Sequence, residues 1–219
     1  MVTRSPFIFC CVFLCILAPS WLFAQTAQDG LEEPNLNVLF SPLLTSDSFL
    51  YVVRPGDSLY MIAQKHHTTV ELIQKVNHLS SEKIRVGDQL KISKAVYSIV
   101  IDKSENELQL LSDGKLLKTY PVAAGKKESP TPIGSFTIVN KLVDPTWYKT
   151  GAVLPPGSPD NILGSRWLGF SLASYGVHGT TMPETVGTSA SKGCIRMHNR
   201  DVEELYAIVP VGVVVTIVE

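Results

Sequence analysis

From Val96 onward, apolar and polar residues alternate in short segments separated by turn residues, a pattern that restricts this part of the chain mainly to strands. The alternation is clearest over 96–102 and 107–112, and the Ser112-Asp113-Gly114-Lys115 stretch that follows is typical of a tight hairpin turn. Helical spacing of apolar residues occurs only near the end, over 202–209, with Asn199 or Asp201 as the expected helix cap. We therefore predict an α+β chain whose larger domain, 96–219, is mainly β, a sandwich or partly closed barrel with one late helix. Further strands are expected over 116–123, 136–139 and 212–218.

The segment Tyr51 to Lys94 has its own compact pattern. A short strand at 51–53 precedes a turn in which Asp57 or Ser58 is suited to cap a helix that begins at Leu59. Thr69 is the expected cap of a second helix, and a closing strand follows at 89–92. This order predicts a small β-α-α-β module.

Between Lys141 and Arg166 the chain is rich in proline and glycine. A loop this long inside a compact domain usually has a functional role. We interpret it as a lid over a site; a surface excursion is the alternative.

The first 24 residues indicate export. Arg4 precedes an almost unbroken apolar run from Pro6 to Ala24, as in a secretory signal peptide, and cleavage is expected after Ala24. An uncleaved anchor is the alternative, since the run approaches the length that spans a bilayer. Residues 25–50 are acidic, contain helix-breaking residues and are predicted to be a linker. The expected location is the periplasm or the cell envelope.

The charge balance and the positions of the cysteines exclude some classes of function. With 19 Lys+Arg against 20 Asp+Glu, the chain lacks the cationic excess that nucleic acid binding requires. Three of the four cysteines lie in the predicted leader, so the mature chain keeps only Cys194 and cannot form an intramolecular disulfide. Cys194 is therefore either a buried inert thiol or a catalytic one.

The neighbours of Cys194 favour catalysis. A thiol becomes a good nucleophile when its thiolate is stabilised, and an imidazole can take the proton. His178 and His198 are the candidates, and Gly193 fits a sharp turn that brings backbone N–H groups close to a developing oxyanion. A Cys/His/His metal site is a weaker alternative, because the spacing of paired cysteine ligands is absent from the sequence. We expect neither a metal nor a cofactor.

Two resemblances extend this reading. Residues 51–94 contain the motifs Tyr51-Val52-Val53, Pro55-Gly56-Asp57-Ser58-Leu59, Ile62-Ala63, Asn77, and Ile84-x-Val86-Gly87-Asp88-x-Leu90-x-Ile92. With these motifs the segment resembles a LysM module, which implies binding to N-acetylglucosamine-containing glycans such as peptidoglycan. Residues 96–219 contain the motifs Tyr120–Gly125, Thr131–Phe136, His178-Gly179-Thr180 and Ser191-Lys192-Gly193-Cys194-Ile195-Arg196-Met197. With these motifs the segment resembles the YkuD-type catalytic domain of the L,D-transpeptidases of bacterial cell walls.

The second resemblance implies roles for individual residues. Cys194 would be the acylated nucleophile and His178 its proton donor and acceptor, with the main-chain carbonyl of Gly179 orienting the ring. The N–H groups of Gly193 and Cys194 would form part of the oxyanion hole. Arg196 would hold a substrate carboxylate or support the loop, and His198 is interpreted as peripheral. Many relatives carry His where this chain has Lys192, which leaves the acceptor preference open.

The implied reaction is acyl transfer on peptidoglycan. The Cys194 thiolate attacks a tetrapeptide stem, D-Ala leaves, and an amine of another stem takes the acyl group to give a 3→3 cross-link. An amine of a wall-attached protein, or water, could replace the second stem as the acceptor of the acyl group. Carbapenem-type compounds are candidate inhibitors of this reaction.

Other functions remain open from the sequence. An L,D-carboxypeptidase would trim stems with the same groups, and a non-catalytic wall-binding protein would use only the LysM module. A sortase-like enzyme would have different residues on either side of its cysteine. A papain-like hydrolase would have its Cys before its His in the sequence, whereas His178 precedes Cys194 here.

Overall fold

The computed structural model describes residues 35–219, which belong to one compact unit. The signal peptide predicted at 1–24 and the first part of the predicted linker lie outside the described residues. The later part of that linker holds α1 (Leu36–Phe40) and the start of β1 (Ser48–Val52). Lys75 Nζ lies 5.1 Å from the centroid of the Phe40 ring, and Lys91 Nζ donates to the Ser41 carbonyl at 2.7 Å. This stretch therefore packs on the module that follows it.

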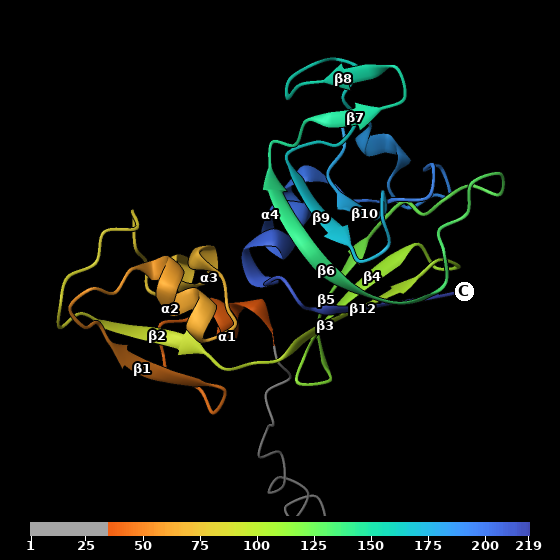
Figure 1. The fold of residues 1–219 in the computed structure, drawn as a ribbon. Coiled ribbons are helices and arrows are strands. Elements are labelled where there is room, and N and C mark those ends of the chain that lie inside the picture. Colours follow the sequence, from red (N-terminus) through yellow and green to blue (C-terminus); the bar gives the residue numbers. More distant parts are fainter. Residues whose placement is uncertain (1–34) are drawn as a thin grey trace, which may run out of the picture. The chain divides into compact units, whose positions relative to one another are not determined.

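That module has the predicted β-α-α-β order (Figure 1). β1 pairs antiparallel with β2 (Gln89–Ser93), and α2 (Leu59–Lys65) and α3 (Val70–Val76) lie between them in the chain. Ser58 and Thr69 cap the helices by accepting bonds from the N–H groups of Met61 and Leu72. Its core contains buried apolar side chains from both strands and both helices, including Tyr51, Leu59, Ile62, Ile73, Leu90 and Ile92.

The larger domain is built on an eight-stranded sheet with the order β11-β10-β9-β6-β12-β3-β4-β5. The pairs β12–β3 and β10–β11 are parallel and the other neighbours are antiparallel. The expected hairpin joins β4 to β5, where Asp113 and Gly114 both have positive φ, as a tight primed turn requires. The strands are β3 (Tyr97–Asp102), β4 (Glu107–Ser112), β5 (Lys115–Pro121), β6 (Gly134–Val143), β9 (Arg166–Phe170), β10 (Gly176–His178), β11 (Ile195–Arg196) and β12 (Val214–Val218).

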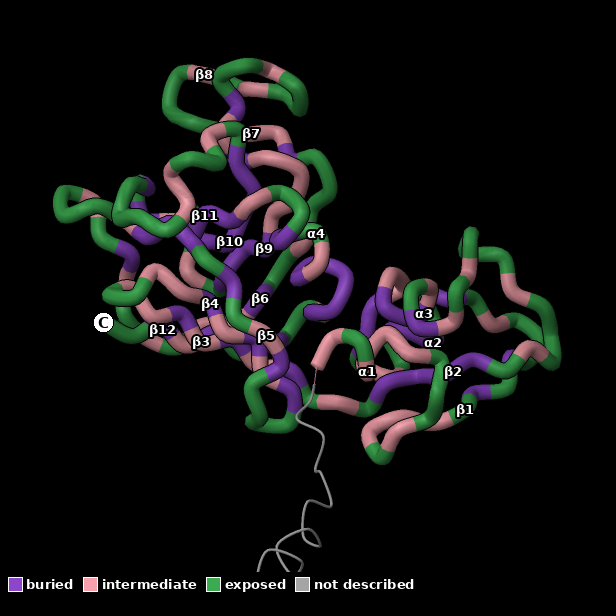
Figure 2. The backbone as a smooth tube through the Cα atoms, turned by 180° about the vertical axis from the view of Figure 1, so that it is seen from behind, coloured by how far each residue is buried: buried purple, intermediate pink, exposed green. Residues whose placement is uncertain are grey.

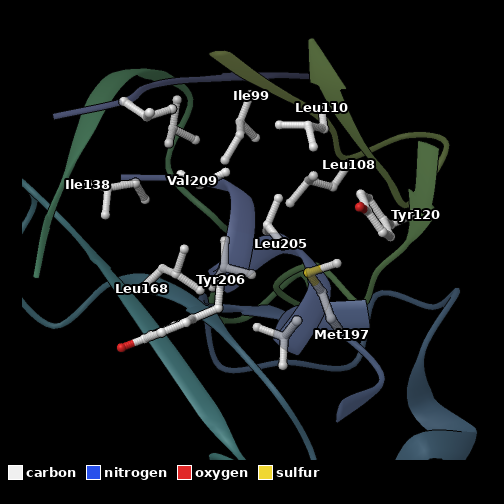
Figure 3. Packing of buried hydrophobic residues seen from close by; sticks show 14 of the residues in the cluster. Ile99, Leu108, Leu110, Tyr120, Ile138, Leu168, Met197, Leu205, Tyr206 and Val209 are labelled. Atoms are coloured by element: carbon white, nitrogen blue, oxygen red, sulfur yellow. The ribbon is translucent and has the colours of Figure 1, made fainter. Parts of the chain in front are cut away.

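β6 joins the two halves of this sheet. Its first residues pair with β12 and its later residues with β9, with a register shift between Ile138 and Asn140. Such an irregularity bends a strand. The bent sheet and α4 (Asn199–Ile208) enclose the core, in which Leu205 of α4 faces Leu108 and Ile99 (Figure 3). The prediction of a mainly-β domain with one late helix is confirmed.

The start of the late helix differs from the prediction. The cap position is His198, which makes no side-chain cap bond, so neither Asn199 nor Asp201 is the cap. The side chain of Asn199 instead bonds the backbone of two distant loops.

Within residues 35–219, no helix is long and apolar enough to cross a membrane. In the same residues no group of three or more His, Cys, Asp or Glu side chains is arranged to hold a metal ion.

Candidate active site

Cys194 and His178 come together where the two shortest strands of the sheet run side by side. β10 and β11 are parallel, with Val177 paired to Ile195 and His178 paired to Arg196. This register puts Cys194, the residue before β11, beside Gly176. Because alternate residues of a strand point to the same face, the side chains of His178, Cys194 and Arg196 share one face of the sheet.

The imidazole of His178 is buried, with 3% of the residue exposed. Nδ1 lies 2.5 Å from the carbonyl oxygen of Gly179. A carbonyl only accepts, so Nδ1 carries the proton and Nε2 keeps the lone pair. Burial lowers the pKa of His178 to about 4, although the carbonyls of Gly179 and Leu163 favour the protonated ring. The site therefore holds a neutral imidazole with a defined tautomer.

The thiol of Cys194 is half-buried, and its Sγ donates to the carbonyl of Ser174 at 3.4 Å. Burial raises the pKa of this thiol, while the Gly176 N–H and the positive charge of Arg196 lower it by smaller amounts. Sequence reasoning favours a thiolate beside an imidazolium. In the structure, burial opposes both charges, so the resting pair is a thiol and a neutral imidazole.

The loop before Cys194 is held by Ser191. Its Oγ donates to the Cys194 carbonyl at 2.5 Å and accepts from the Gly193 N–H at 3.0 Å. Gly193 has φ +109°, and a Cβ there would meet the Tyr175 ring at 2.9 Å, so the position requires glycine. The Gly193 N–H, an expected oxyanion donor, is engaged by Ser191 in this state.

The motif upstream, at 120–125, supports this loop from its other side. Ala123 and Arg196 exchange both backbone hydrogen bonds, at 2.8 and 3.0 Å. The Ser191 N–H donates to the Ala124 carbonyl at 2.9 Å. Two stretches that are distant in the sequence thus form one framework around the thiol.

A cavity of about 260 Å³ opens at Cys194. The predicted lid segment supplies Trp147 and Tyr148, which lie on a hairpin of β7 (Trp147–Lys149) and β8 (Ala152–Leu154). This hairpin is mostly exposed or intermediate in burial (Figure 2). Trp167 also lines the cavity and stacks on the His178 ring, with centroids 6.0 Å apart and planes at 19°. An apolar, aromatic wall therefore surrounds the accessible thiol.

The lid segment is fixed at its base by Asn161, which is 5% exposed. Its Nδ2 donates to the carbonyls of Pro145, Leu154 and Pro155 at 2.9, 3.0 and 3.2 Å. Its Oδ1 accepts from the Leu163 N–H at 3.0 Å. One buried amide thus joins the two ends of the hairpin.

Arg196 is 5% exposed and one Nη donates to Thr185 Oγ1 at 3.3 Å. Its buried Nε has no hydrogen-bond partner within the described residues. Burial lowers the pKa of this guanidinium, whereas Cys194 when it is ionised and the charge of Glu184 raise it. A buried cation with an unused donor can accept an anionic group.

The structure brings together the predicted site residues Cys194, His178, Gly179, Gly193 and Arg196, whereas Lys192 is exposed and His198 serves as the start of α4. Sequence reasoning did not assign roles to Ser191, Asn161 or Trp167. Ser191 lies in the cysteine motif quoted above, and this position was the sequence signal that could have identified it. The contacts of Asn161 and Trp167 form only in the folded chain, so the sequence gives no signal for them.

A thiol and an imidazole on one face of a sheet, with the thiol at an open cavity, are the groups that enzymes with a cysteine nucleophile use. Comparison with known proteins defines the family. Residues 96–217 match the model of the L,D-transpeptidase catalytic domain, YkuD, and residues 51–93 match the LysM domain. The chain belongs to the L,D-transpeptidase family of enzymes and carries an N-terminal LysM domain.

Two relatives are similar over most of their length. The Bacillus licheniformis protein named "Putative L,D-transpeptidase YkuD" is 37% identical over 175 residues, which cover 77% of this chain and 98% of the relative. The Bacillus subtilis protein of the same name is 35% identical over 173 residues, covering 76% and 97%.

Solved structures share the fold. An L,D-transpeptidase from Mycobacterium tuberculosis superposes with a TM-score of 0.50 at 22% identity, covering 61% of this chain and 63% of that chain, so less than two thirds of its length is matched. L,D-transpeptidase 3 from the same species, in complex with a faropenem-derived adduct, gives a TM-score of 0.50 at 22% identity and covers 61% and 66%.

Proposed function

We propose that this enzyme is an exported cell-wall L,D-transpeptidase that forms cross-links between peptidoglycan stems. The observation that carries the proposal is the shared face of β10 and β11, where His178 lies beside a thiol that opens to a cavity. Membership of the family supports the reaction type. A site of action outside the cytoplasm, in the periplasm or cell envelope, follows from the wall substrate.

In the first half-reaction, Nε2 of His178 accepts the proton of Cys194 as Sγ attacks the carbonyl carbon before the terminal D-Ala of a tetrapeptide stem. The S–C bond forms, the C–N bond to D-Ala breaks, and His178 returns the proton to the departing amine. Nδ1–H remains bonded to the Gly179 carbonyl and stabilises the imidazolium that forms in between.

In the second half-reaction, the amine of another stem attacks the thioester. The new C–N bond forms, the C–S bond breaks, and a proton passes through His178 back to Sγ. The apolar wall of the cavity disfavours water as the competing acceptor. An amine of a wall-attached protein fits the same step.

Developing negative charge on the carbonyl oxygen requires backbone donors. The Cys194 N–H is the leading one, because the Gly193 N–H must first leave Ser191 Oγ. Arg196 provides positive charge on the same face of the sheet. We propose that it binds a carboxylate of the donor stem or supports the loop.

The LysM domain supports a role for glycan binding in the same molecule. A module that holds the glycan raises the local concentration of its stems at the catalytic domain. The second candidate function is an L,D-carboxypeptidase, in which water completes the second step with the same groups.

Covalent labelling of the purified chain tests the nucleophile. Faropenem is the probe, since a protein of the same fold carries an adduct derived from it. We expect one adduct by intact mass that Cys194→Ala abolishes, and His178→Gln slows its formation by about 100-fold or more. His198→Ala is the control for loss of a histidine and labels like the unmodified chain. An adduct that survives in Cys194→Ala, or its absence from folded unmodified protein, would contradict the assignment of Cys194 as the nucleophile.

A further inference from the structure

The side chain of Asn199 bonds two backbone segments next to the imidazole of His178. Its Oδ1 accepts from the Thr180 N–H at 3.0 Å and from the Ser165 N–H at 3.2 Å. The residue is exposed, yet this oxygen is closely enclosed: a Cβ added to Gly179 or Gly164 would collide with it. Glycine at both positions is therefore a condition for this contact.

The bond to Thr180 acts on the group that orients the catalytic ring. The Thr180 N–H and the Gly179 carbonyl belong to the same peptide unit, which is planar and rigid. The Gly179 carbonyl accepts from Nδ1 of His178 at 2.5 Å. Holding the N–H of this unit therefore fixes the direction of its carbonyl, and a rotated peptide would lose both hydrogen bonds.

The bond to Ser165 ties a second backbone segment to the same amide oxygen. The Leu163 carbonyl also favours a proton on His178, and it lies two residues before Ser165. One amide oxygen thus joins the two backbone segments that supply both carbonyls.

We propose that Asn199 is a positioning residue that fixes the Nδ1–H tautomer of His178 by holding the Gly179–Thr180 peptide plane. It does not touch the reacting atoms. The proposal rests on the function of His178 proposed above, because the tautomer decides whether Nε2 is free to accept the thiol proton. Water that replaced the amide would satisfy the donors without holding the plane.

The experiment compares Asn199→Ala with Asn199→Asp in the full chain. The carboxylate of Asp keeps an acceptor oxygen, so this variant is the conservative rescue. Arg200→Ala, the next residue of α4, with its side chain 85% exposed, is the matched control for changes at the start of the helix. The readouts are the ¹⁵N chemical shifts of the His178 ring, which distinguish the tautomers, and the pH profile of Cys194 acylation by faropenem.

We expect Asn199→Ala to mix the two tautomers and to slow acylation by about 10-fold to 100-fold. Asn199→Asp should restore a single tautomer and most of the rate, and Arg200→Ala should match the unmodified chain. If Asn199→Ala does not fold, Asn199→Ser replaces it, because serine suits the first turn of a helix but is too short to reach both donors.

An unchanged tautomer and pH profile in the Ala or Ser variant would overturn the proposal. Loss of rate with an unchanged tautomer, or without recovery in Asn199→Asp, would also overturn it, since either result indicates a packing effect. The ring shifts are measured without substrate, so this test stays separate from the assignment of Cys194, which is tested by the presence of the adduct on the unmodified chain and its loss in Cys194→Ala.

Discussion

At the scale of single residues, burial decides the resting charge of the site. His178 is neutral because burial lowers its pKa to about 4, and Cys194 is protonated because burial raises its pKa. The Gly176 N–H and Arg196 partly offset the effect on the thiol. In the mechanism proposed above, the thiolate is generated when the substrate is bound, by transfer of the proton to Nε2, and that mechanism needs no standing ion pair.

The raised pKa of Cys194 predicts how the alkylation of this thiol depends on pH. A raised thiol pKa means that the thiolate fraction is small at neutral pH and grows roughly tenfold per pH unit. The rate of Cys194 alkylation by iodoacetamide should therefore keep rising from pH 6 through pH 8. The label is read on the peptide that contains Cys194, because the chain has four cysteines. A plateau below pH 7 would show a thiolate–imidazolium pair and contradict the account.

Sequence predicted the residues that carry distinctive chemistry, such as Cys194 and His178. It did not predict the polar residues that hold them. Asparagine is a residue type that favours helix caps, and Asn199 was one of the two residues predicted as the cap. Its side-chain oxygen instead accepts hydrogen bonds from Ser165 and Thr180, which only the folded sheet brings near it. Likewise, engagement of the Gly193 N–H by Ser191 is a matter of loop geometry that spacing does not reveal.

At the scale of elements, the lid depends on one buried amide. Asn161 satisfies the carbonyls of Pro145, Leu154 and Pro155 and the N–H of Leu163, so it joins the β7–β8 hairpin to the segment that returns to β9. Residues of the segment 141–166, predicted to be a lid, line the cavity that opens at Cys194. Its short strands were not predicted, because three-residue strands are too brief to show a period.

Replacing Asn161 should loosen the lid while the thiol keeps its own reactivity. Asn161→Ala leaves several backbone groups without partners and costs about 2 kcal/mol of stability. We expect faster hydrogen exchange over residues 145–163 and a higher KM for a stem donor, with alkylation of Cys194 nearly unchanged. Asp160→Ala, an exposed change in the same loop, is the control. Unaltered exchange and KM in Asn161→Ala would show that the amide does not hold the lid.

At the scale of the whole molecule, local and long-range order were predictable to different degrees. The LysM domain followed from the sequence because its caps and turns are local, as Ser58 and Thr69 show. The order of the large sheet did not follow, since β12 pairs with both β3 and β6 across long stretches of chain, and β10 pairs with β11 across a loop. Those pairings create the face on which Cys194 meets His178.

The most direct test of the central claim is product analysis after incubation of the purified enzyme with disaccharide-tetrapeptide muropeptides. We predict release of D-Ala together with a cross-linked dimer, and loss of both products in Cys194→Ala. Release of D-Ala with only tripeptide would assign the enzyme to carboxypeptidase activity. Release of D-Ala that persists in Cys194→Ala, or its absence with folded enzyme and intact substrate, would contradict the claim that this thiol is the nucleophile of a transpeptidase.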